Sequence, residues 1–463
     1  MTQQPDIWSA HTLLDADQQH VWHPLTQHAP FLSGKKQPLV ITRAQGSKVF
    51  DTNGESYLDG AAGLWCVNVG YGRQELIAAA TEQLQRLAFY PLTQTHPAAI
   101  QLAQRLAEYL PHTPRIYFSN SGSEANEVAF KTVRQFWRQA GFPDKTKIIS
   151  RHRGYHGSSL GALAATGQEG RKRGYGPMPA DFIQVVAPDC YRCPFGLAQP
   201  TCGTLCASEF ERRIVVEGAD TVAAVIIEPI IGGGGVLVPP AGYLEQVEAI
   251  CRKYQVLLIV DEVVTGFGRT GTMFGHTAFG IRPDVVTMAK GMTSGYIPMA
   301  ATAFSEKIFQ AFVSEDGESK HVRHINTYSG HPVAAAVALA NLAVIENEQL
   351  ADQATLLGNY LRTTLQEALA GIDCVGEIRG RGLLVGIELV DPISGLPISS
   401  RHMQAVSTEL LLRKIIMGKT TDTVRQHNNV LIVAPPLVIL PEELNQLVEA
   451  VQLSIRAVLA QVV

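Results

Sequence analysis

Residues with chemically useful side chains follow four apolar segments of this 463-residue chain. They are Ser121-Gly122-Ser123 after 115–118, Glu228 after 222–227, Asp261 after 256–260 and Lys290 shortly after 284–287. Hydroxyl groups bind anions, carboxylates pair with cations, and a neutral amine attacks carbonyl carbons. Open α/β sheets bind their ligands beyond the carboxyl ends of the strands. If these segments are neighbouring strands, we expect one site at that edge of the sheet.

Ser121-Gly122-Ser123 lies between an expected strand over 115–118 and an expected helix over 123–138. The glycine lets the backbone approach an anion and the helix N-terminus supplies N–H groups, so the segment predicts a phosphate site. The same residues also fit a simple capping box, with Ser121 as the cap and Glu124 reaching back to it. The sequence alone leaves both interpretations open.

Asp261 and Lys290 have ordinary alternatives when each is taken alone, as a loop aspartate and a surface lysine. A carboxylate at the end of a buried strand is costly unless a cation such as a protonated pyridine nitrogen pairs with it. Apolar surroundings lower the pKa of a lysine, so that more of the amine is neutral and can attack an aldehyde. Together with a phosphate loop earlier in the chain, the two residues predict a site for pyridoxal 5′-phosphate (PLP). Glu228 would lie in the same site or form a structural salt bridge.

The elements that must position these residues alternate between short apolar runs and longer helical patterns. The runs are rich in Val and Ile and mostly lack polar alternation, which is typical of strands buried on both faces of a mostly parallel sheet. They are 115–118, 147–149, 182–186, 222–227, 256–260 and 284–287. This alternation with helices predicts an α/β fold.

Three parts of the chain are expected. The segment 1–69, with short extended stretches and a turn at Asp51-Thr52-Asn53-Gly54, is expected to pack with the C-terminal part. Residues 70–331 would form a large cofactor-binding domain. Residues 332–463 begin with a helical pattern and predict a smaller α+β domain, with strands over 380–390 and 430–433.

Composition excludes several classes of partner. The chain is 46% apolar and 17% charged with a net charge of −4, which gives no reason to expect nucleic acid or a membrane surface. The apolar run 332–345 falls short of the roughly 20 residues of a membrane span, and residues 1–10 lack the pattern of a signal peptide. Seven cysteines fit reduced thiols better than a disulfide framework. A cytoplasmic protein is therefore expected.

Four motifs in the same order resemble those of the class III aminotransferases of PLP fold type I. The motifs are Asn120-Ser121-Gly122-Ser123-Glu124-Ala125-Asn126, Gly154-Tyr155-His156-Gly157, the segment 261–271 followed by Lys290, and Asn326-Thr327-Tyr328. The resemblance runs from about Val21 to the C-terminus. It implies an aspartate-aminotransferase-like fold, in which a large domain with a mostly parallel seven-stranded sheet carries a smaller α+β domain.

The resemblance also implies a role for each matching residue. Lys290 would carry PLP as a Schiff base and act as general acid and base, and Asp261 would pair with the ring nitrogen, with Glu228 in support. The remaining implied cofactor contacts are Ser121, Gly122 and Ser123 at the phosphate, Tyr155 and Val263 on the two ring faces, His156 beside them, and Thr327 at the phosphate of a neighbouring subunit. A homodimer or tetramer with shared active sites is therefore implied.

Within the family, the segments 21–24, 63–72 and 428–436 are most similar to the ω-amine:pyruvate and taurine:pyruvate transaminases. This similarity implies a ping-pong transamination from a primary amine or ω-amino acid to a keto acid, with pyruvate the expected acceptor. Trp65, either Phe89 or Tyr90, and Tyr155 would line the substrate pocket, and aromatic walls suit an amine with an apolar body.

The segment before Pro435-Pro436 departs from the family pattern. Many relatives have an arginine there that binds the carboxylate of the acceptor, and this chain has no clear equivalent. Arg425 and Lys419 are the candidates, although a lysine is a less directional carboxylate ligand. The sequence therefore leaves open which residue binds the acceptor and which keto acid is used.

Other functions remain as alternatives. PLP decarboxylases and aminomutases use the same lysine and aspartate on the same fold. Cys190, Cys193, Cys202 and Cys206 have a C-x2-C-x8-C-x3-C spacing that could bind zinc, but their segment resembles a transaminase loop in which no metal is expected. Gly232–Gly235 invites a nucleotide-binding interpretation, but it lacks the Gly-Lys-Ser/Thr ending of a P-loop and the following helix.

Overall fold

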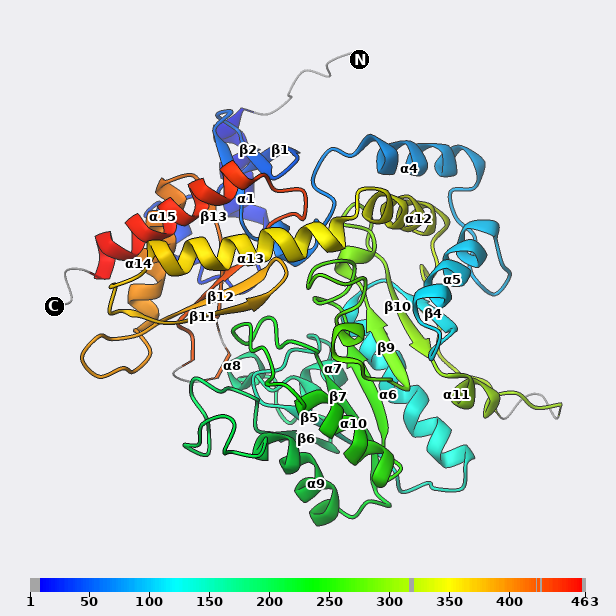
Figure 1. The fold of residues 1–463 in the computed structure, drawn as a ribbon. Coiled ribbons are helices and arrows are strands. Elements are labelled where there is room, and N and C mark those ends of the chain that lie inside the picture. The colour runs from blue at the N-terminus through cyan, green and yellow to red at the C-terminus, as the bar shows by residue number, and fades with distance from the viewer. Residues whose placement is uncertain (1–8, 316–319, 422, 425–426, 460–463) are drawn as a thin grey trace.

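A central sheet of seven strands organises the computed structural model, which describes residues 9–315, 320–421, 423–424 and 427–459. The strand order is β4 (Arg115–Ser119), β10 (Ala300–Phe304), β9 (Val285–Met288), β8 (Leu257–Asp261), β7 (Val222–Ile227), β5 (Lys147–Arg151) and β6 (Phe182–Val185) (Figure 1). β5 pairs in parallel with β6 and β7, and β8 pairs in parallel with β7 and β9. Only β10 runs against its neighbours, β4 and β9. The predicted mostly parallel seven-stranded sheet is confirmed.

Helices cover both faces of this sheet. Helix α6 (Gly122–Gln139) packs on one face, where Ala223, Ile226 and Ile259 point toward it. Helices α9 (Leu205–Glu217) and α10 (Tyr243–Lys253) cover the other face, which receives the alternate residues of the same strands. Because successive side chains of a strand point to opposite faces, a strand between two helical layers must be apolar throughout. This burial explains the continuous Val and Ile runs.

Strand β10 was missed from the sequence, because Ala300-Ala301-Thr302-Ala303-Phe304 has no Val or Ile. All five residues are buried. The Thr302 hydroxyl donates a hydrogen bond to the Ala125 carbonyl of α6 at 2.8 Å. Small side chains allow this close approach of helix and sheet, so local packing overrides strand propensity here.

Two smaller sheets complete the strands. One has the order β1 (Ile41–Gln45), β2 (Lys48–Asp51), β3 (Ser56–Asp59) and β13 (Ile415–Ile416), and the other β11 (Val375–Arg381), β12 (Leu384–Leu389), β15 (Val430–Val433) and β14 (Gly418–Lys419). The single strand expected over 380–390 in fact contains the last residues of β11, a turn and the whole of β12, which pairs antiparallel with β11. β3 pairs with β13, a contact that packing of the N-terminal segment with the C-terminal part would require. The division into three parts stays a prediction.

The remaining helices surround these sheets. They are α1 (Ala10–His20), α2 (Ala29–Leu32), α3 (Ala62–Trp65), α4 (Gln74–Arg86), α5 (Pro97–Tyr109), α7 (Leu160–Ala165), α8 (Glu169–Lys172), α11 (Glu306–Gln310), α12 (Pro332–Asn347), α13 (Leu350–Ala368), α14 (Ser400–Leu412) and α15 (Pro441–Leu459), with 3₁₀ turns η1 (Gly275–Phe279) and η2 (Lys290–Met292). α12 packs against α4 and α5 near β4 (Figure 1). No single helix in the described ranges is long and apolar enough to cross a membrane; α12 and α13 pass that test only as a pair bent by 60°.

Candidate active site

The sheet brings the predicted site residues to one edge. β8 and β9 are parallel neighbours with Asp261 opposite Thr287, so Asp261 and Lys290 leave adjacent strand ends. β4 is antiparallel to β10, as β9 is, so β4 and β9 run the same way and Ser121 follows β4 at the same edge. Neighbouring parallel strands thus explain how residues more than a hundred positions apart converge.

The Asp261 carboxylate is buried and held by three hydrogen-bond donors. Oδ2 accepts from His156 Nδ1 at 2.8 Å and from Asn126 Nδ2 at 2.9 Å, and Oδ1 accepts from the Val263 backbone N–H at 3.0 Å. The side chain is only 3% exposed. Donors around a carboxylate fix the orientation of its two oxygens. A buried anion held in this way is suited to pair with a cationic ring nitrogen.

Asn126 is a site residue whose role the sequence did not reveal. It lies on α6 one turn after Gly122 and is fully buried. Besides Asp261, its amide donates to the His156 carbonyl at 2.6 Å, and its oxygen accepts from the Thr287 hydroxyl at 2.9 Å. Asn126 therefore ties together helix α6, the His156 segment and the ends of β8 and β9. The signal was a polar residue on the sheet-facing side of an amphipathic helix, where apolar residues are expected.

Lys290 begins the turn η2 with a φ of +48°, in the left-handed region that costs a non-glycine residue roughly 1–3 kcal/mol. Its Nζ lies 5.0 Å from the centre of the Trp65 ring. Burial lowers the pKa of the Lys290 amine below its usual range, and the nearby negative charges of Asp261 and Glu228 offset only part of this effect. The lowered pKa increases the fraction of neutral amine, as nucleophilic attack on an aldehyde requires.

Glu228 connects two loops beside the site. Its Oε1 accepts from the Tyr155 backbone N–H and its Oε2 from the Gly232 N–H, each at 3.0 Å. Burial raises the pKa of this carboxyl. In the described part of the chain Glu228 forms no ion pair, so the salt bridge considered from the sequence is absent there. The carboxylate instead positions the backbone that carries Tyr155.

The phosphate-loop and capping-box interpretations are compatible. Ser121 Oγ accepts from the Glu124 N–H at 3.2 Å, and Glu124 Oε2 accepts from the Ser121 N–H at 3.0 Å, which completes the box. The first N–H groups of a helix have no partner within it, and this cap uses neither Gly122 nor Ser123. A Cβ on Gly122 would lie 3.0 Å from a methyl group of Val263. Glycine thus leaves the space in which an anion could approach.

The aromatic residues expected in the pocket fall into two groups. Trp65 lies against Lys290, and its ring is 3.4 Å from where a Cβ of Gly233 would be. Phe89 instead lies 5.6 Å from the ring centres of both Tyr328 and His331. Phe89 and its neighbour Tyr90 are 37% and 48% exposed, so both face outward from this chain.

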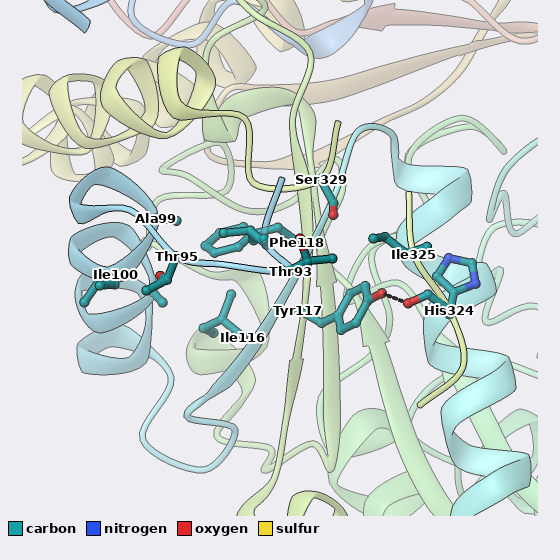
Figure 2. Close-up of a pocket in the computed structure, with 12 residues that line it drawn as sticks. Thr93, Thr95, Ala99, Ile100, Ile116, Tyr117, Phe118, His324, Ile325 and Ser329 are labelled. Carbon is teal, nitrogen blue, oxygen red and sulfur yellow. Dashed lines mark hydrogen bonds between the residues drawn. The ribbon is translucent and has the colours of Figure 1, made fainter. Parts of the chain in front are cut away.

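The predicted phosphate ligand Thr327 lies on an exposed segment. This segment borders a cavity of about 420 Å³, in which the Tyr117 hydroxyl donates to the His324 carbonyl (Figure 2). Figure 2 shows Phe118, Ile325 and Ser329 around the same space. Neither Lys290 nor Asp261 lines this cavity. Thr327 is therefore associated with a second, outward-facing surface.

The two candidates for the acceptor carboxylate have different outcomes. Lys419 Nζ donates to Gln404 Oε1 of helix α14 at 2.5 Å. Arg425 lies outside the described residues.

The four cysteines at 190–206 and the glycines at 232–235 were considered as zinc and nucleotide sites. The four cysteines line one small cavity of about 20 Å³, and all seven cysteines of the chain are free thiols. Within the described ranges, no group of three or more His, Cys, Asp or Glu side chains is arranged to hold a metal ion. A Cβ on Gly234 would lie 2.2 Å from the Arg153 carbonyl, so close backbone packing explains that glycine.

These features fit PLP. A buried, donor-held carboxylate and a partly buried amine leave adjacent strand ends, and a glycine at a helix N-terminus is available for the phosphate. A seven-stranded α/β sheet with this lysine and aspartate defines the class as a fold type I PLP enzyme.

The chain belongs to the class III aminotransferases, whose family model matches residues 32–455. It is 46% identical over 448 residues to an uncharacterized aminotransferase of Bacillus subtilis (strain 168), covering 96% of this chain and 97% of that protein. It is 39% identical over 442 residues to a taurine–pyruvate aminotransferase of Bilophila wadsworthia, covering 95% and 96%. A thermostable (S)-enantioselective ω-transaminase from Thermomicrobium roseum has a similar structure, with a TM-score of 0.92, 41% identity and coverage of 98% and 99%. The enzyme is a PLP-dependent transaminase.

Proposed function

We propose that the enzyme transfers an amino group from a primary amine or ω-amino acid to a keto acid, with pyruvate as the acceptor, in a ping-pong cycle. The main support is the position of the Lys290 amine beneath the Trp65 ring, which forms an aromatic wall on one side of the amine. An apolar wall suits a donor whose body is uncharged. The names of the taurine–pyruvate and ω-transaminase relatives favour the same donor and acceptor classes.

PLP, when bound, supplies an aldehyde that condenses with amines and a ring that withdraws electrons from the adjacent carbon. In our proposal Asp261, whose oxygens are oriented by His156 and Asn126, would pair with the ring nitrogen. Gly122 and Ser123 would hold the phosphate, Ser121 caps the helix that supplies their N–H groups, and Tyr155 and Val263 would contact the ring.

Lys290 then performs the proton transfer. Its lowered pKa leaves a neutral Nζ that can accept the proton from the substrate carbon. The turn η2 follows β9 directly, so a rigid strand end determines the position of this amine. Trp65 covers the amine and limits the access of water, which would compete for the proton.

We also propose a homodimer in which Thr327, Phe89 and Tyr90 complete the site of the neighbouring subunit. Phe89, Tyr90, Ile325 and Tyr328 are 37–62% exposed, and the cavity beside Thr327 opens on the same surface. An exposed apolar patch of this kind is typical of a subunit interface. Phe89 lies against Tyr328, so the two would cross the interface together with Thr327. The seven free thiols support a reducing, cytoplasmic location.

A panel of amine donors with pyruvate and 2-oxoglutarate as alternative acceptors tests the proposed function. We expect alanine from pyruvate with a primary amine or ω-amino acid, and no release of carbon dioxide. Carbon dioxide without alanine would identify a decarboxylase, and rearranged amino acid without an acceptor would identify an aminomutase. Absence of activity with both keto acids would refute the proposal.

A further inference from the structure

Arg171 is a cation beside the active site whose role is unassigned. It lies on the short helix α8, and its guanidinium carbon is 5.0 Å from the centre of the Tyr155 ring. Its Nε donates to Gln168 Oε1 at 2.7 Å. Within the described ranges Arg171 forms no ion pair, whereas its neighbour Lys172 pairs with Glu169. A partly buried arginine without a carboxylate partner retains donors for an anionic ligand.

Arg171 is linked to Lys290 by a chain of contacts and by an electrostatic interaction. Trp65, whose ring lies over Lys290 Nζ, and the Gln168 amide both approach Gly233, at 3.4 and 3.8 Å from where its Cβ would be. Gln168 is therefore adjacent to the wall of the Lys290 site. The positive charge of Arg171 also contributes to the lowered pKa of Lys290, so the two cations interact electrostatically.

The position of Arg171 is determined by its surroundings. Gln168 is fully buried, and its Nε2 donates to the Arg153 carbonyl at 2.9 Å. A Cβ on Gly167 would lie 2.0 Å from the Arg151 carbonyl, so the start of this loop packs directly on the segment that leads to Tyr155. The Arg171 guanidinium is thus oriented before any ligand arrives, which lowers the entropy lost on binding.

Among the described residues, the other cations near this wall each have a hydrogen-bond or ion-pair partner. Arg153 pairs with Asp189 and donates to the Gly234 carbonyl, and Arg151 donates to the Glu228 carbonyl. Lys419, one of the two candidates from the sequence, also donates to a neutral side chain, Gln404, but its ammonium group lacks the planar fork that allows a guanidinium to bind a carboxylate through two parallel hydrogen bonds. A keto-acid carboxylate in a pocket with aromatic walls still needs a cationic partner, because burying an unpaired carboxylate is costly.

We propose that Arg171 binds the carboxylate of the keto-acid acceptor and thereby determines acceptor specificity. This inference rests on the proposed function, since it concerns the second substrate of that reaction. Gln168 binds only the Nε of the guanidinium, so the two terminal nitrogens can form two parallel hydrogen bonds to one carboxylate. An amine donor with an uncharged body does not use this contact.

Steady-state kinetics and ligand binding of Arg171→Gln, Arg171→Lys and the control Arg173→Gln test the proposal. Arg173 is two residues away and exposed, so its loss removes the same charge outside the pocket. In a ping-pong reaction kcat/KM for each substrate reports its own half-reaction. We expect Arg171→Gln to lower kcat/KM for pyruvate by about 10- to 100-fold, as for loss of a charge-assisted hydrogen bond. The value for benzylamine, a donor without an acidic group, should stay within about twofold of wild type, and Arg171→Lys should be intermediate.

Propionate, a carboxylate without a keto group, provides a readout that needs no turnover. Its dissociation constant, from the visible absorbance of the holoenzyme, should rise in Arg171→Gln by a factor similar to that for pyruvate and remain unchanged in Arg173→Gln. Equal losses for pyruvate and benzylamine would show a merely structural role, and unchanged pyruvate and propionate values would overturn the proposal. Loss of pyruvate use in Arg425→Gln but not in Arg171→Gln would also overturn it. If the wild-type enzyme does not aminate pyruvate but propionate binding still depends on Arg171, the proposed acceptor fails and the carboxylate site stands.

Discussion

Replacing Gly157 with alanine should displace Ser123 of the phosphate loop, although Gly157 itself is not expected to contact the cofactor. Gly157 has a φ of +136°, and a Cβ there would lie 2.4 Å from Ser123 Oγ, 2.8 Å from Ala162 Cβ and 2.9 Å from Ser123 Cα. Real Cβ atoms essentially never approach other atoms closer than 3.0 Å. Ser123 must therefore move away from Gly157, together with the backbone N–H group that we expect to hold the phosphate.

The size of the effect follows from two contributions. Alanine at a positive φ destabilises a protein by about 1 kcal/mol or more. Overpacking at the Ser123 contact adds about 1–3 kcal/mol. We therefore expect the free energy of unfolding to fall by about 2–4 kcal/mol. A weakened charge-assisted hydrogen bond to phosphate should reduce cofactor affinity by about tenfold or more.

Gly141→Ala is the matched control, because Gly141 also has a positive φ, +90°, but no atom lies within 4 Å of its missing Cβ. Urea unfolding of both variants at one protein concentration separates the contact energy from the backbone strain, and absorbance titration of the cofactor-free proteins measures the affinity. In a Ser123→Ala background the penalty of Gly157→Ala should shrink without vanishing, since the contacts to Cα and to Ala162 remain. If Gly157→Ala is as stable as Gly141→Ala and binds PLP within twofold of wild type, the packing argument is wrong.

Three further predictions concern the lysine, the carboxylate support and the interface. Burial lowers the pKa of Lys290 in the folded state, so the unfolded chain binds more protons between that lowered pKa and about 10.4. The free energy of unfolding of the cofactor-free protein should therefore rise with pH across this window. Urea unfolding at several pH values should show a weaker rise for Lys290→Met. If this free energy rises equally with pH in Lys290→Met and in the wild type, the prediction is wrong. Asn126→Ala removes two donated hydrogen bonds and an acceptor, all buried, and should lower the free energy of unfolding by about 2–4 kcal/mol and weaken cofactor binding. Thr287→Val loses only one of these bonds and should lower it by about 1 kcal/mol, with little effect on the cofactor. If urea unfolding shows both variants to be fully folded in the assay and they bind the cofactor equally well, Asn126 does not support the Asp261 carboxylate as we infer. Ile325→Asp should shift the molecular mass measured by light scattering from dimer to monomer, while Ile393→Asp, at an even more exposed position, should leave it unchanged; a dimeric Ile325→Asp would argue against this interface.

Much of the fold followed from patterns that act locally. The Val- and Ile-rich segments predicted six of the seven central strands, because a strand covered by helices on both faces has to be apolar along its whole length. The helix after Ser121 followed from its cap and its apolar periodicity. Strand β10 and the division of 380–390 into two strands were not predicted, since close packing and a turn within the run decide them.

The order of residues along the chain was enough to predict which residue types follow the strands and therefore the class of chemistry. Asp261 and Lys290 each end an apolar run, and that placement depends only on neighbouring residues along the chain. The surroundings of these two residues depend on the folded chain. Asn126 holds Asp261, Trp65 covers Lys290, and Arg171 lies against Tyr155. These contacts join residues separated by 16 to 225 positions, so they arise only once strand order and helix packing bring distant segments together.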